Sequence, residues 1–245
     1  MKIPPARRIR TGAILAAAGA AVLAVGGCGG SGGAATHDSA TGSKAPAAPA
    51  APEILKGSAL KGLLLPASAM PKGFRIEADG TRNSGEAVAP RTSAPVPAKK
   101  VCGALGQTSW IRVTGIGEAA FAQTDFGNAG NTEEIAQEID TYHGDDARQA
   151  MAELRKVFAH CATFTDKSSG ATAKVKVTSA KLHGVGDEGV KAVATSSAWD
   201  GGTTLAAVRV GNAIVTTLYS SSHADKGAAA VTMTEQVAKK VNAAS

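Results

Sequence analysis

The stretch VKAVATSSAWDGGTTLAAVRVGNAIVTTLYS, residues 190–220, decides the fold of this chain. Its runs of β-branched and small apolar residues are interrupted by Asp200-Gly201-Gly202 and by Gly211-Asn212. Short turns of Gly, Asn and Asp between such runs are typical of β-hairpins. We therefore predict an antiparallel meander with strands over Val190–Trp199, Thr203–Val210 and Ala213–Ser220.

Further strands are predicted upstream of the meander. In Ala171–Leu182, Val175 and Val177 alternate with lysines, as in a half-buried strand. The pattern of Thr132–Tyr142 fits a helix or a strand. We favour the strand, because Gly144-Asp145-Asp146 can then begin the next helix. Either aspartate can be the N-cap of that helix. Less regular segments predict a short helix before Pro66, a strand from Phe74, a helix over Ala98–Gln107, and extended chain over Ser109–Val113 and Glu118–Phe126.

Two amphipathic helices are expected to cover the sheet. Apolar residues of the first recur at spacings of 4, 3, 4 and 3, which is one face of a helix over Ala147–Cys161. The second, over about Ala228–Asn242, carries apolar residues near one face. A sheet with an apolar face needs such cover. The expected fold is therefore α+β, an antiparallel sheet covered by two or more helices in a single domain.

The N-terminus has the layout of a secretory signal over residues 1–27: a basic start, then an uncharged run of 15 residues over Thr11–Val25, then small residues. The run is short for a membrane-spanning helix, which needs about 20 apolar residues. Val25-Gly26-Gly27-Cys28 resembles a lipobox, so we expect diacylglycerol on Cys28 and a lipid anchor on the extracytoplasmic face of the cell membrane. A plain secretory signal is the alternative, and Sec or twin-arginine export stays open at Arg7-Arg8.

Residues 28–52, after the cleavage point, are rich in Gly, Ser, Ala and Pro and cannot bury enough apolar surface to fold. We interpret them as the lipidated cysteine and its flexible tether. One globular domain is predicted over residues 53–245. Within it, residues 79–100 are rich in Gly, Pro, Ser and charge, which indicates a long surface loop.

The net charge of +6 overstates how basic the exported protein is. Four of the 26 basic residues and no acidic residue lie in the signal, so the mature chain has 22 basic and 20 acidic residues. Nucleic-acid binding calls for a much larger basic excess, and with only 4% aromatic residues there is no platform for stacking bases. We expect no nucleic-acid partner.

Cys102 and Cys161 remain once Cys28 carries lipid. An oxidising compartment permits disulfides, so we predict that the two are bonded, with two unrelated buried thiols as the alternative. Two cysteines are too few for a cysteine-type zinc site, and no histidine lies at ligand spacing beside them. No metal or cofactor is expected.

Several short motifs together resemble one family. They are LLLPASAMPKGF at residues 63–74, the cysteine helix, CATF at 161–164, GDE at 186–188 and VRVGN at 208–212. Their order is similar to that of the actinobacterial sensor-domain lipoproteins, which resemble the PknH-type extracellular domain of receptor kinases. The resemblance covers roughly residues 55–242. It implies an antiparallel sheet with packed helices, a cleft, disulfide bonding and sensing of an undefined ligand. The chain departs from the kinase pattern because it has no kinase domain and two domain cysteines instead of four.

One segment resembles a catalytic phosphate-binding motif but is incomplete. The segment Gly184–Gly189 has the glycines of a phosphate loop but lacks its Lys-Ser/Thr, and Asp187 and Glu188 would repel phosphate. As strand neighbours they should also point to opposite faces. His143, His183 and His223 lie near the ends of predicted elements, and His37 lies in the tether. Trp110 and Trp199 are expected in the core or at a sheet edge. We expect no enzyme, with a cell-wall hydrolase as the remaining catalytic alternative.

Two non-catalytic functions follow from these observations. The first is a membrane-anchored extracytoplasmic module that binds or senses an unknown small or lipid-like ligand in a cleft between sheet and helices. The second is an envelope lipoprotein that binds another envelope protein, which predicts an exposed apolar patch instead of a cavity.

Overall fold

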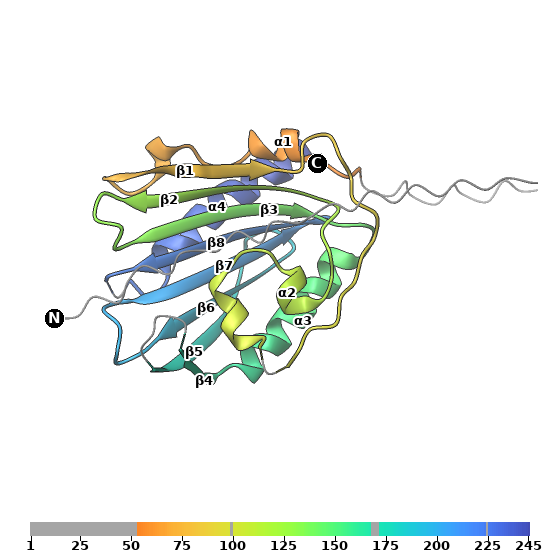
Figure 1. The fold of residues 1–245 in the computed structure, drawn as a ribbon. Coiled ribbons are helices and arrows are strands. Elements are labelled where there is room, and N and C mark those ends of the chain that lie inside the picture. Colours follow the sequence, from red (N-terminus) through yellow and green to blue (C-terminus); the bar gives the residue numbers. More distant parts are fainter. Residues whose placement is uncertain (1–52, 99, 168–171, 224) are drawn as a thin grey trace, which may run out of the picture. The chain divides into compact units, whose positions relative to one another are not determined.

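The computed structural model describes residues 53–98, 100–167, 172–223 and 225–245. Its eight strands form one antiparallel sheet in the order β1-β2-β3-β8-β7-β6-β5-β4 (Figure 1). The strands are β1 (Phe74–Asn83), β2 (Ala120–Asn128), β3 (Glu134–Thr141), β4 (Thr163–Asp166), β5 (Ala173–Leu182), β6 (Glu188–Thr195), β7 (Gly202–Val210) and β8 (Ala213–Ser221). The helices are α1 (Gly57–Lys61), α2 (Ile111–Thr114), α3 (Asp146–His160) and α4 (Ala228–Ala244), with 3-10 turns η1 (Ala67–Ala69) and η2 (Cys102–Gly106). The predicted α+β single domain is confirmed.

The predicted signal, Cys28 and the tether lie outside the described residues. Within the described ranges, no helix has the length and apolar character that crossing a membrane requires.

The meander forms as the turn chemistry predicts. Strand β6 pairs with β7, and β7 pairs with β8 from Val210–Ala213 to Gly202–Ser221. Gly211 in the second turn has φ of 57°, a left-handed conformation that glycine adopts without steric cost. The ambiguous segment is strand β3, which places Ile139 opposite Val215 on β8. The favoured strand interpretation is therefore confirmed.

Both faces of the sheet are apolar, whereas one covered face was expected. On β7, Ala206 and Val208 pack into the cluster under α4, and the alternate residues Leu205 and Ala207 pack into the cluster under α3. Helix α4 lies behind the sheet in Figure 1, and η2, α2 and α3 lie in front of it. Side chains alternate between the faces of a strand, so apolar residues at both parities require cover on both sides.

Two sequence predictions for the cover in front of the sheet were wrong. The expected helix over Ala98–Gln107 is the shorter turn η2, and the segment expected to be extended at Ser109–Val113 instead runs into helix α2. Trp110 explains the second error because its buried indole Nε1 donates a hydrogen bond to Thr216 Oγ1 at 2.9 Å. This long-range contact overrides the strand propensity of the β-branched residues that follow.

The expected loop over residues 79–100 begins later than predicted. Strand β1 continues to Asn83 through an irregular register between Ile76 and Thr81, where Asp79 has φ of 58°. The following segment is fixed at several points, among them the hydrogen bond from Ala89 N to Ala119 O and the ion pair from Arg91 to Asp146. Strand β4 was missed because four residues are too short to show an alternating pattern.

Candidate ligand-binding pocket

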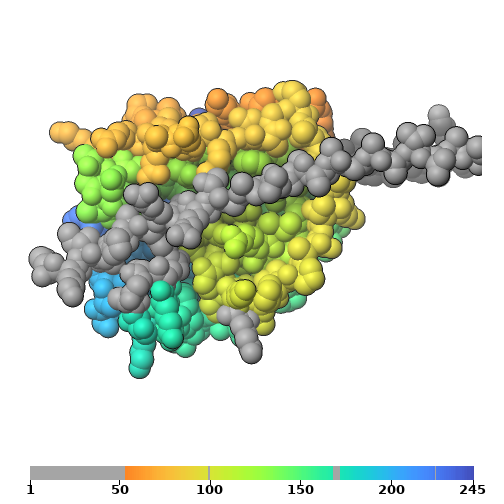
Figure 2. Space-filling view, in the orientation of Figure 1, coloured from red at the N-terminus to blue at the C-terminus, as the bar shows by residue number. Residues whose placement is uncertain are grey.

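A disulfide links two parts of the front cover, which consists of η2, α2 and α3. Cys102, at the start of η2, is bonded to Cys161, which directly follows α3, with 5.4 Å between their Cα atoms. The predicted pairing is therefore present in the structure. Cys161 completes the apolar stripe of α3, and its partner holds η2 over the same face of the sheet. Figure 2 shows the yellow atoms of η2 and α2 standing on this face.

A pocket that opens to solvent lies next to this disulfide. Its walls come from η2, the C-terminal end of α3 and β4, and its floor comes from the central strands. Most of the lining is apolar: Cys102, Leu105, Gly106, Phe158, Phe164, Val177, Ala192, Ala194, Trp199, Leu205 and Leu218. Such a lining suits an apolar ligand.

The two tryptophans have different positions. Trp110 is 1% exposed and belongs to the core, as expected. Trp199 follows β6, is half-buried and lines the pocket. The expectation of a core or sheet-edge position therefore did not anticipate that Trp199 would line the pocket.

Glu134, Thr203 and Ser220 make the rest of the pocket lining polar. Thr203 Oγ1 and Ser220 Oγ are hydrogen-bonded to each other at 3.1 Å across β7 and β8. Glu134 begins β3 opposite Ser220. Partial burial, and then the charges of Glu77 and Asp125, raise the pKa of Glu134 to about 7. The pocket thus combines an apolar body with one carboxyl group that protonates near neutral pH.

Two further acidic residues lie on the same face of β3 as Glu134 and are more deeply buried. Glu138 and Asp140 are 3% and 1% exposed. Thr108 Oγ1 donates a hydrogen bond to Glu138, but neither oxygen of Asp140 accepts one from an amide, hydroxyl or basic side chain among the described residues. Burial raises the pKa of Glu138 to about 7, and burial with the charge of Glu138 raises the pKa of Asp140 well above its usual value.

Sequence reasoning assigned no role to Glu134, Glu138 or Asp140. The signal was nonetheless present, because residues at intervals of two on one strand share a face. Once β3 is taken as a strand with Ile135 and Ile139 toward one helix, these three acids necessarily lie on the opposite face. The sequence did not show that this face would also be covered.

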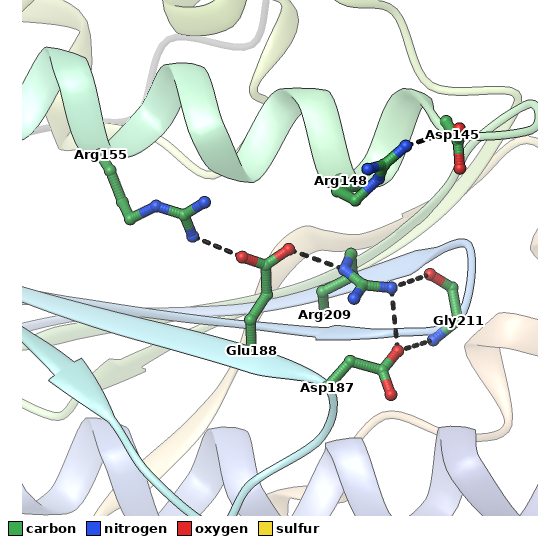
Figure 3. A network of polar contacts seen from close by, with 7 residues as sticks. All are labelled: Asp145, Arg148, Arg155, Asp187, Glu188, Arg209 and Gly211. Carbon is green, nitrogen blue, oxygen red and sulfur yellow. Dashed lines mark hydrogen bonds and ion pairs between the residues drawn. The ribbon is translucent and has the colours of Figure 1, made fainter.

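The glycine-rich segment at 184–189 is structural. Its carboxylates bind arginines instead of facing a ligand site: Arg209 contacts Asp187 at 2.9 Å and Glu188 at 2.8 Å, and Arg155 of α3 contacts Glu188 at 2.5 Å (Figure 3). The expectation that Asp187 and Glu188 point to opposite faces was wrong, because Asp187 precedes β6 and both acids reach Arg209. The network joins α3 to the β6–β7 pair at Glu188 and Arg209.

The first turn of α3 departs from the expected capping. Asp145 is the N-cap residue but makes no capping hydrogen bond with its side chain, which pairs with Arg148 at 2.7 Å (Figure 3). Asp146 binds Arg91 instead.

One cluster contains the residue types of a hydrolytic triad without its geometry. His223 Nδ1 lies 2.9 Å from Ser222 Oγ and 3.3 Å from Glu133 Oε1. A triad uses one ring nitrogen for the serine and the other for the acid. Here both contacts fall on the same nitrogen, and the His223 side chain is 84% exposed. The cluster ties the β3 and β8 ends together and gives no support to hydrolysis.

No group of three or more His, Cys, Asp or Glu residues in the described ranges is arranged to hold a metal ion.

Comparison with known proteins identifies the fold. No family model and no curated protein matches the sequence. Among solved structures, the fold is similar to that of the extracellular domain of PknH from Mycobacterium tuberculosis, with a TM-score of 0.58 and 17% sequence identity. The match covers 78% of this chain and 98% of that domain. The chain therefore has the fold of the PknH extracellular domain, as its sequence resemblance implied.

Proposed function

We propose that this chain is an extracytoplasmic binding or sensor module, anchored to the cell membrane by diacylglycerol on Cys28, that takes an apolar or lipid-like ligand into the pocket beside the Cys102–Cys161 disulfide. The pocket carries the proposal: its apolar lining comes from five strands, from η2 with Cys102, and from α3, and it opens to solvent. A well-formed apolar pocket with a few polar groups is the usual form of a small-molecule site.

Three observations support the extracytoplasmic location. The sequence begins with a signal-like segment that ends in a lipobox-like Cys28. Disulfides persist in oxidising compartments, and Cys102 and Cys161 form one. The similar fold belongs to an extracellular domain. A diacylated cysteine anchors stably because two acyl chains bind a bilayer where one is marginal.

The alternative of a protein-binding envelope lipoprotein receives less support. It requires a contiguous exposed apolar patch. In the described part of the chain, the large apolar side chains that stand out as exposed are Ile76 and Val88, at 46% and 42%. Two side chains fall short of such a patch.

The anchor is tested by Cys28→Ser in the full chain expressed in its own type of host. We expect the wild type in the membrane fraction and the variant without the mass of an acylated N-terminal cysteine, because serine offers no thiol for the thioether bond. Detergent partitioning and intact mass spectrometry measure both properties. An identical acylated mass for the two proteins would contradict the anchor.

The pocket is tested with the neutral apolar fluorophore N-phenyl-1-naphthylamine and the unlipidated mature chain from residue 29, secreted into an oxidising compartment. We expect the probe to bind, and Ala194→Phe to weaken binding at least tenfold, because Ala194 lines the pocket and a phenyl ring there fills it. Fluorescence titration measures the affinity.

Ala180→Phe is the matched control for this substitution. Ala180 is exposed on β5 and does not line the pocket. The same ring at this site should leave probe affinity within twofold, with circular dichroism showing that both variants fold. Failure of the wild type to bind, or equal binding by the wild type and Ala194→Phe, would contradict ligand uptake in this pocket.

A further inference from the structure

The lining of the pocket contains one carboxylate that has no basic partner. Glu134 makes no ion pair and accepts no hydrogen bond from side chains of the described residues, whereas Thr203 and Ser220 satisfy each other. A half-buried carboxylate that faces an apolar pocket without a partner loses solvation and gains no compensating interaction. A ligand group that supplies a positive charge would provide that interaction.

The backbone beside Glu134 brings other carboxylates close to it. Gly127 is its register partner on β2 and carries no side chain. Glu77 of β1 occupies the space above Gly127, since a Cβ placed there would lie 2.8 Å from Glu77 Oε1. Asp125 lies two residues along the same face of β2. The charges of Glu77 and Asp125 both act on Glu134, so three carboxylates from three adjacent strands share this end of the face.

The arginines on these strands do not neutralise Glu134. Arg82 is bound to Asp125 at 3.1 Å, and Arg75 lies opposite Gly127 as an exposed residue that forms no ion pair with Glu134. An anionic headgroup at this position would meet Glu134, with Glu77 and Asp125 behind it. A cation would be attracted by Glu134 and Glu77, whereas the charge of Asp125 is offset by Arg82.

We propose that the pocket selects an amphiphile with an apolar tail and a cationic amine or quaternary ammonium head, the tail lying between η2 and the strand floor and the head at Glu134. This inference rests on the proposed function of the pocket and adds the charge of the ligand to it. The cationic headgroup is inferred from the carboxylates around Glu134, and the apolar tail is inferred from the apolar lining of the pocket.

The test compares three probes with the same ten-carbon chain: decyltrimethylammonium, decanol and decanoate. Isothermal titration calorimetry with the unlipidated mature chain at pH 8, where Glu134 is mostly ionised, measures each affinity below the concentration at which the probe aggregates. We expect decyltrimethylammonium to bind at least tenfold more tightly than decanol, and decanoate to bind more weakly than decanol. The quaternary head has a fixed charge, so its own protonation does not enter the comparison.

Glu134→Gln is the decisive variant because glutamine keeps the shape of the side chain and removes its charge. We expect it to reduce the preference for decyltrimethylammonium over decanol to about twofold or less, and to leave the affinity for decanol unchanged. Glu235→Gln on α4 is the matched control, since it makes the same change in net charge on the other side of the sheet. Its preference should equal that of the wild type.

The outcomes separate the two proposals. If none of the three probes binds, uptake of an apolar ligand in the pocket is wrong. If all bind with equal affinity, or decanoate binds best, the pocket takes up amphiphiles but the cationic headgroup is wrong. If Glu235→Gln lowers the preference as much as Glu134→Gln does, the preference reflects net charge and the assignment of Glu134 is overturned.

Discussion

Replacing both Cys102 and Cys161 with alanine is expected to lower the free energy of unfolding by about 4 kcal/mol. The bond joins residues 59 positions apart, and closing a loop of that length in the unfolded chain accounts for a loss of this size in the chain-entropy model. For a domain of this size the midpoint of thermal unfolding should fall by roughly 10 °C. Urea and thermal unfolding of the unlipidated mature chain measure the two quantities.

A reducing agent provides the control for this variant. Reduction should destabilise the wild type by a similar amount and leave the alanine variant unchanged. Because Cys102 also lines the pocket at the start of η2, affinity for the neutral fluorophore should fall together with stability. If reduction leaves the free energy of unfolding of the wild type unchanged, the prediction is wrong, because the bond then neither restricts the unfolded chain nor stabilises η2 on the sheet.

The buried acids of β3 should make the protein more stable at pH 5 than at pH 8. The pKa of Glu138 is about 7 in the folded chain and near 4.5 when unfolded, so between these values the folded state binds the extra proton. The contribution of Glu138 to the free energy of unfolding is therefore fully present below about pH 4.5 and is lost as the pH rises through 7. The difference across this window is on the order of 3 kcal/mol for Glu138. Asp140, whose pKa is also raised, acts in the same direction.

Glu138→Gln should remove the part of this pH dependence that Glu138 contributes and leave the part from Asp140. It should also stabilise the protein at pH 8, because it removes a buried charge while glutamine still accepts the hydrogen bond from Thr108. Urea unfolding at pH 5, 6, 7 and 8 measures the effect. Glu188→Gln is the contrasting control. Partial burial opposes ionisation of Glu188, but its hydrogen bonds from Arg209 and Arg155 outweigh burial and lower its pKa. Its contribution is therefore present above about pH 4.5, so this variant should lose similar stability at pH 5 and pH 8. A wild-type stability that rises from pH 5 to pH 8 would contradict the assignment.

The regular part of the fold followed from local sequence. The turns at Gly201 and Gly211 and the runs of β-branched and small apolar residues that they interrupt predicted the meander, since turn type and strand propensity are properties of a few neighbouring residues. The apolar spacing of Ala147–Cys161 determined helix α3 in the same way. The disulfide followed from cysteine count and compartment, and needed no knowledge of the fold.

Tertiary structure alone decided the front cover and the pocket. Helix α2 forms where the local sequence favours a strand, because Trp110 reaches Thr216, which is 106 residues away. The charge at the pocket depends on Glu77, Asp125 and Glu134 lying on three strands that no local pattern aligns. The sequence by itself determined which residues form strands and helices, because those choices depend on neighbours along the chain. Which face is covered, which carboxylate lacks a partner and where a pocket remains depend on contacts between distant residues, and only the folded structure fixes these.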